Sequence, residues 1–234
     1  MKTPIFMKNT YGEWAVSLVI SAAGVLACMG ALTLRGRPLT LYSFNKGAAL
    51  TAIGLVLLVI AVGSLGRTTA FSKPMRLRRP LGICASLLMI GHAGLSLFYF
   101  PDKYDWGYYG KNWEALLYGL AALIGFSLLW LTSYEVMFRR MGRTAWKKLH
   151  NGMYILLALG VLHFCHLGKP LCWLDWLEGV QNQSCVRDGR IPPLSFILIL
   201  GLVLVSVVRL LEPIARQRKW VDDWDDRDDN DNGG

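Results

Sequence analysis

The chain has 234 residues, of which 53% are hydrophobic and only 18% are charged. The hydrophobic residues gather in runs of about 20, the length at which a helix crosses a bilayer core, and this excludes an ordinary soluble domain. The formal net charge of +9 would suit nucleic acid in a soluble protein. Here the cations lie between the apolar runs, as topology signals do. We therefore expect the lipid bilayer as a partner and no nucleic acid.

Six apolar runs are each long enough to span a membrane, and backbone groups in lipid need the internal hydrogen bonds of a helix. The predicted fold class is all-α, a polytopic six-helix transmembrane bundle in one domain, 1–212. Residues 213–234 are rich in aspartate and are expected to form a disordered acidic tail, because like charges repel and solvate. The predicted spans are 14–34, 47–66, 80–100, 115–134, 149–168 and 193–212.

The distribution of lysine and arginine predicts the orientation of these spans. Segments 67–79 and 135–148 and the flank after the last span are strongly basic, whereas 101–114 and 169–192 balance their charges. Because cytoplasmic loops carry the excess of cations, both termini are predicted to be cytoplasmic. The basic segment 35–46 is the exception.

The first run allows another interpretation, a lipoprotein-type signal that ends before Cys28. The run continues to Leu34, which makes a full span instead of a short signal core. We therefore expect a membrane helix here.

The chain has four histidines, and two of them lie at matching depths in two predicted spans. His92 follows Pro80 by 12 residues and His163 follows His150 by 13, so both lie about 18–20 Å from the start of their helices. Imidazole in hydrocarbon is costly, which marks it as a candidate functional site. Two level imidazoles suit the axial positions of a haem iron. The alternative is one or two buried histidines that hydrogen-bond to backbone or serine.

His150 lies about 20 Å below His163, at the predicted inner boundary. That separation suits a second haem, a flavin or a quinone. Arg78 and Arg79 are candidates to pair with haem propionates or a flavin phosphate, and they also fit plain topology signals. Two observations weigh against a second haem: the third span has no matching histidine, and His150 and His163 point about 140° apart on an ideal helix.

Three other residues complete the candidate set. His166, one turn beyond His163, is an alternative ligand, a proton carrier or an interfacial residue, and we favour the last. Cys172 and Cys185 share one predicted outer loop, where a disulfide is expected if the compartment is oxidising. No nucleophile–base set or glycine-rich phosphate loop lies in the spans, so we expect an electron-transfer subunit instead of a stand-alone enzyme.

Two stretches carry a resemblance to a known family. TAWKKLHNGMYILLALGVLHFCHLGK (144–169) and LRRPLGICASLLMIGH (77–92) resemble the fifth- and third-helix signatures of MsrQ, the haem-binding membrane subunit of the periplasmic methionine-sulfoxide reductase system. His150, His163 and His92 occupy the signature positions. The resemblance covers roughly 45–169 and extends to ferric-reductase-like membrane domains.

The resemblance implies haem b, one or two per chain, and allows FMN. It implies a bacterial inner-membrane protein that takes electrons from quinone or a cytoplasmic flavin reductase and passes them to a periplasmic reductase, such as a molybdopterin enzyme. The long outer loop 169–192, His166 and the acidic tail depart from the family pattern. Two other functions remain open: reduction of external ferric iron or another acceptor, and haem-free binding or transport of a divalent metal.

Overall fold

The computed structural model describes residues 11–68, 76–100, 104–167, 169–179 and 192–208. These residues form helices and no strand, which confirms the all-α prediction. The elements are α1 (Tyr11–Leu34), α2 (Leu41–Thr68), α3 (Arg78–Gly94), the π-helical turn η3 (Leu95–Tyr99), α4 (Trp106–Lys111), α5 (Trp113–Leu131), α6 (Glu135–Asn151), α7 (Met153–His166), α8 (Lys169–Leu177) and an apolar helix Leu194–Val208.

Four of the described helices are long and apolar enough to cross a membrane: Tyr11–Leu34, Leu41–Ser64, Arg78–Tyr99 and Trp113–Leu131. The pair Thr144–His166 and Pro170–Leu177, bent by 67°, makes a fifth if it is one broken span. The predicted last span, 193–212, runs past the described residues, and so does the tail 213–234. The count of six spans and the cytoplasmic termini therefore stay predictions.

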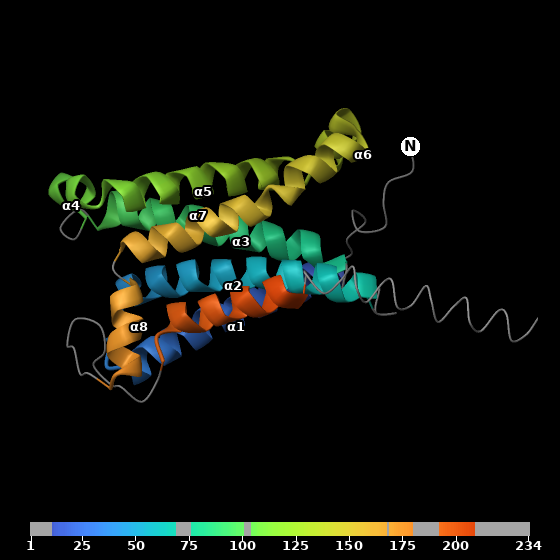
Figure 1. Cartoon of the computed structure of the whole chain (residues 1–234). Coiled ribbons are helices and arrows are strands. Elements are labelled where there is room, and N and C mark those ends of the chain that lie inside the picture. Colours follow the sequence, from blue (N-terminus) through green and yellow to red (C-terminus); the bar gives the residue numbers. More distant parts are fainter. Residues whose placement is uncertain (1–10, 69–75, 101–103, 168, 180–191, 209–234) are drawn as a thin grey trace, which may run out of the picture.

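The helix at the centre of the bundle is α2. Of its most apolar stretch 67% is buried, against 28% or less for the other three long helices. It packs against α1 and α3, while α5 packs against α7. Figure 1 shows α5 and α7 along one side of the bundle and α1 with Leu194–Val208 along the other. The core side chains at these contacts include Val56, Ile60, Leu81, Phe126 and Leu157.

The outer faces of the helices expose large apolar side chains. Val19, Leu26, Ile124 and Ile155 are each more than 60% exposed. Such a surface would drive aggregation in water but suits the acyl chains of lipid, where helices need no polar outer face. The molecule is therefore built as a multi-pass membrane protein.

Three predicted loops contain helices. Figure 1 shows α4 and α8 at one end of the bundle and α6 at the other. The basic segment 135–148 was expected to be a loop before a helix that starts at Leu149, but it is helical from Glu135. Its apolar side chains explain this, because Phe138 is only 2% exposed and its ring packs edge-on against Trp146 at 5.6 Å.

Two glycines divide this region. Gly142 has φ +75° and ψ 161° and bends α6, and Gly152 separates α6 from α7. The predicted fifth span is thus the end of α6 joined to α7, with its last residue, Gly168, outside the described residues.

The basic segment 35–46 has structural uses for its cations. Arg35 is only 8% exposed, and the Lys46 ammonium lies 4.4 Å from the centre of the Tyr42 ring. These contacts give the cations of segment 35–46 a structural role, so their presence need not indicate a cytoplasmic loop.

Candidate functional site

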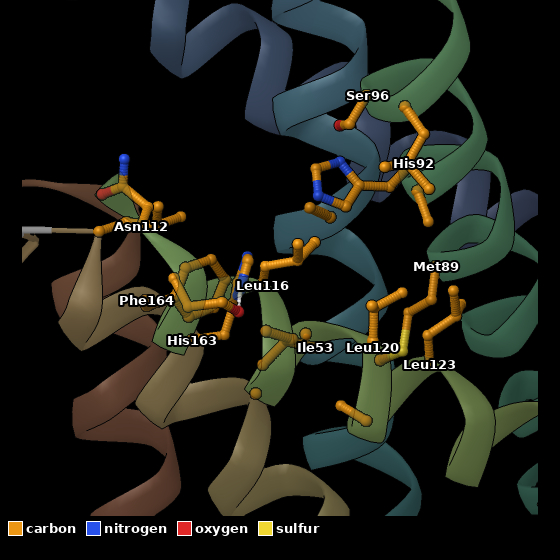
Figure 2. A pocket seen from close by; sticks show the side chains of 18 of the residues that line it. Ile53, Met89, His92, Ser96, Asn112, Leu116, Leu120, Leu123, His163 and Phe164 are labelled. Atoms are coloured by element: carbon orange, nitrogen blue, oxygen red, sulfur yellow. Dashed lines mark hydrogen bonds between the residues drawn. The ribbon is translucent and has the colours of Figure 1, made fainter. Parts of the chain in front are cut away.

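His92 and His163 line the same cavity. It has a volume of about 190 Å³ and lies between α2, α3, η3, α5 and α7. Figure 2 shows the two rings on facing sides of this space. The structure thus brings together His92 and His163, the two histidines that were predicted to lie at similar depths in their helices.

His92, on α3, is held through Nδ1. This nitrogen lies 2.9 Å from Asn45 Oδ1 and 3.2 Å from the Asn45 backbone carbonyl. A carbonyl oxygen only accepts hydrogen bonds, so Nδ1 carries the proton and donates it. Nε2 is therefore the nitrogen with the free lone pair.

His163, on α7, is held in the same way by α5. Its Nδ1 lies 2.7 Å from the Ala115 carbonyl oxygen and donates to it. Gly119, one turn along α5, makes room for the ring, because a Cβ there would lie 2.8 Å from Nδ1 and 3.1 Å from Cε1. With the proton on Nδ1, the lone pair of the His163 imidazole is on Nε2.

The rest of the cavity is apolar in its interior and polar at its α4 end. Aliphatic and aromatic side chains from four helices form the walls, among them Ile53, Met89, Leu120, Leu123 and Phe126. Ser96, Tyr104, Tyr108, Tyr109 and Asn112 line the end beside α4. Such a space, mostly apolar with a few convergent polar groups, is typical of a cofactor site.

The phenol of Tyr104 is part of this polar end. Burial, followed by the hydrogen bond that it donates to the Tyr42 hydroxyl at 3.3 Å, raises the pKa of Tyr104. The group is therefore neutral at physiological pH and offers a hydroxyl instead of a charge. Burial also raises the pKa of Tyr108.

The donor set fits a haem. Two neutral imidazoles with Nδ1 bound to oxygen and Nε2 facing a shared apolar cavity are what bis-histidine ligation requires, and the Nδ1 partners hold each ring in orientation. A single divalent ion such as zinc needs more donors than these two rings. Among the described residues, no three His, Cys, Asp or Glu side chains come together as a metal site.

His150 lies at the end of α6, away from this cavity. Its ring stacks on Trp146 with centroids 3.9 Å apart, and its Nδ1 donates to the Trp146 carbonyl at 3.1 Å. Its Nε2 is 3.4 Å from the Ser133 hydroxyl, whose shorter contact, 2.6 Å, is to the Leu129 carbonyl. The single hydroxyl proton thus favours Leu129, and His150 also interacts with the Leu129 backbone.

The two candidate arginines, Arg78 and Arg79, have different interaction partners in the structure. The Nε of Arg78 donates to the Val59 carbonyl at 3.3 Å, and its guanidinium passes Gly63, where a Cβ would lie 2.9 Å from Cζ. Arg78 also interacts electrostatically with His150. Arg79 interacts instead with Tyr134 and Glu135. Only Arg78 therefore belongs with His150.

His166 has both nitrogens engaged outside the cavity. Its Nδ1 donates to the Leu162 carbonyl at 2.9 Å, and its Nε2 lies 3.2 Å from a Glu114 carboxylate oxygen. The ring is 5.0 Å from that of Tyr118. These contacts are those of an interfacial residue that ties α7 to α5.

The cysteines divide into two groups. Cys172, on α8, is disulfide-bonded, whereas Cys28, Cys84 and Cys165 are free thiols. Cys185 lies outside the described residues, so the pairing of Cys172 with Cys185 stays a prediction.

Sequence reasoning missed the groups that orient the two rings. Asn45 lies just before the predicted second span. An amide so close to an apolar run could have indicated a hydrogen-bond partner for a buried histidine, but that signal was not used. Gly119 and the Ala115 carbonyl had no signal, because only the packing of α5 on α7 shows their role.

Comparisons with known proteins identify the family of this chain. The family described as "Ferric reductase like transmembrane component" matches residues 47–161. The chain is 31% identical over 169 residues to the "Protein-methionine-sulfoxide reductase heme-binding subunit MsrQ" of Rhodospirillum rubrum, covering 69% of this chain and 71% of that protein. The protein of the same name from Caulobacter vibrioides is 30% identical over 122 residues, 49% of this chain and 56% of that protein. On its sequence, the chain belongs to the MsrQ family, within the ferric-reductase-like transmembrane proteins.

Proposed function

We propose that this chain is a haem-binding electron-transfer subunit of a methionine-sulfoxide reductase system, with His92 and His163 as the axial ligands of a b-type haem. The observation that carries the proposal is the pair of Nδ1-anchored imidazoles on facing sides of one apolar cavity. When bound, haem supplies reversible one-electron exchange at its iron.

The chain's own residues bind and orient the group. His92 and His163 would hold the haem iron, and their Nδ1 hydrogen bonds to Asn45 and Ala115 keep both rings in the tautomer that presents Nε2. The apolar walls keep water from the site, and the low dielectric makes the potential depend strongly on nearby dipoles.

The direction of electron flow is part of the proposal. The cavity lies toward the α4 end of the bundle, which the lysine and arginine pattern predicts to be extracytoplasmic. Electrons from quinone or a cytoplasmic flavin reductase would enter near α6 and leave near α4 to a periplasmic reductase. The names of the relatives support a methionine-sulfoxide reductase as the partner. The long apolar helices support a membrane location, for which we propose the bacterial inner membrane.

For the inner end we propose a contact with the electron donor, FMN or a quinone, at His150 and Arg78. The position of His150 at the end of α6 and its electrostatic interaction with the Arg78 cation support it. A second haem is the weaker alternative, because the other three histidines are engaged elsewhere.

The decisive test is the visible spectrum of purified protein. His92→Ala and His163→Ala should each abolish the low-spin b-type spectrum, because each removes one of two iron ligands, while the protein still inserts. His166→Ala is the matched control and should keep the spectrum, since its ring is bound to Leu162 and Glu114. A low-spin spectrum that survives in both ligand variants would refute the assignment. A pyridine haemochrome count of one per chain is expected, and two would revive the inner haem.

A second function, reduction of external ferric iron, is favoured by the family match to ferric-reductase-like components. Membranes supplied with an electron donor and a ferric chelate would separate the two. Rapid ferric reduction that needs no periplasmic reductase would favour this alternative.

A further inference from the structure

The two candidate ligands are held by different kinds of group. His163 donates its Nδ1 proton to a backbone carbonyl, which no substitution removes. His92 donates mainly to a side chain, the Oδ1 of Asn45 at 2.9 Å, with the backbone carbonyl of the same residue farther away at 3.2 Å. The environment of His92 is therefore the one that a side chain can tune.

The Asn45 side chain is fixed on both sides. It is only 1% exposed, and its Nδ2 donates to Ser96 Oγ at 2.9 Å. Because an amide presents its oxygen and nitrogen on opposite sides, this bond directs Oδ1 toward His92. An asparagine this deep in an apolar bundle is costly unless both ends are bonded, and here they are.

The same network reaches the polar end of the cavity. Ser96 lies in η3, the π-helical turn that follows His92 on the same chain, and its carbonyl accepts a hydrogen bond from the Tyr109 hydroxyl at 3.3 Å. Asn45 thus ties α2 to α3 and η3 at the level of His92. Asn45 is not itself a lining residue, so a change there reaches the cavity only through His92 and Ser96, which do line it.

We propose that Asn45 is the positioning residue of His92 and that its side-chain carbonyl sets the reduction potential of the site. A stronger acceptor at Nδ1 makes the imidazole a stronger donor to iron and favours the ferric state; a weaker acceptor favours the ferrous state. This inference rests on the proposed haem ligation by His92 and His163.

The test is a spectroscopic redox titration of three purified full-length variants. Asn45→Leu keeps the shape and removes the acceptor, so the midpoint potential should rise and haem affinity should fall about 10–100-fold. Asn45→Asp keeps an acceptor and strengthens it, so the potential should fall below that of the wild type. Ser96→Ala is the matched control: it removes the group that orients the Asn45 amide but keeps Oδ1 as an acceptor for His92 Nδ1, so its shift should have the same sign as that of Asn45→Leu and be smaller.

Wild-type potential and haem content in both Asn45 variants would overturn the inference, and so would a shift in Ser96→Ala as large as that in Asn45→Leu. If Asn45→Leu does not fold, Asn45→Asp decides alone, and a potential at or above the wild-type value counts against the proposal. These outcomes leave the haem ligation intact. A wild-type protein without haem would instead overturn the proposed function itself.

Discussion

At the scale of single residues, the site depends on two positions where a missing or polar side chain decides the orientation of an imidazole. Asn45 holds His92 through a hydrogen bond, and Gly119 holds His163 by leaving room for its ring. Neither residue can bind iron at the place where it lies. Both act on the metal site through a histidine.

Gly119→Ala should displace His163. The added Cβ would lie 2.8 Å from His163 Nδ1, so the ring must move off the Ala115 carbonyl, at a cost of about 1–3 kcal/mol for overpacking. The expected result is a reduced haem-to-protein ratio and an altered low-spin spectrum in a protein that still inserts.

Gly91→Ala is the control for this substitution. It adds the same methyl group beside His92, where no atom lies within 4 Å of the new Cβ. It should keep the wild-type spectrum. Equal spectra for Gly119→Ala and Gly91→Ala would show that Gly119 has no role in orienting His163.

At the scale of elements, α6 shows how a basic segment between spans becomes a helix. Phe138 and Trp146 pack on one another, and Trp146 Nε1 donates to the Thr132 carbonyl at 2.9 Å, which ties α6 to the end of α5. Trp146 also stacks on His150. The bend at Gly142 lies between Phe138 and Trp146, so it affects how the α6 end of the bundle packs around His150.

Gly142→Ala should therefore destabilise the protein. With φ +75° and ψ 161°, Gly142 occupies a region that is nearly exclusive to glycine, and a side chain there costs about 1–3 kcal/mol. We expect a lower Tm for the purified protein in detergent. Gly30→Ala, in the regular helix α1 with open space around the new Cβ, should leave Tm unchanged or higher. A Tm for Gly142→Ala equal to that of Gly30→Ala would contradict this account of the bend.

At the scale of the whole molecule, the number of membrane crossings depends on the bent pair and on the last described helix. Four helices cross by length and composition, the bent pair makes a fifth, and Leu194–Val208 supplies most of the predicted sixth. Leu198, Leu202 and Val205 of that helix pack against the core. This packing is what a sixth span of the same bundle would make.

Six spans require both termini to lie on the same side. A fluorescent protein fused after Gly234 should fluoresce in a bacterial host, and alkaline phosphatase at the same point should be inactive. Fusions that end in segment 101–114 should behave in the opposite way and serve as the control. Active phosphatase at the C-terminus would mean an odd number of spans or a reversed orientation.

Much of this protein follows from linear distances along the chain. Helix rise is constant, so the lengths of the apolar runs predicted membrane helices, and residue numbers predicted that His92 and His163 lie at one level. In the structure both residues line one cavity, and their role as ligands stays a prediction. The disulfide partner of Cys172 and the side of the membrane on which the termini lie remain predictions.

What the chain order could not reveal depends on rotation about helix axes and on contacts between helices. Which nitrogen of each histidine is free follows from Asn45 and Ala115, which lie 47 and 48 positions away in sequence. The helix α6 was missed because its apolar residues are few and gain their burial only by packing. Periodicity and depth are properties of one helix, whereas side-chain orientation at a site is a property of several, and only their packing decided it.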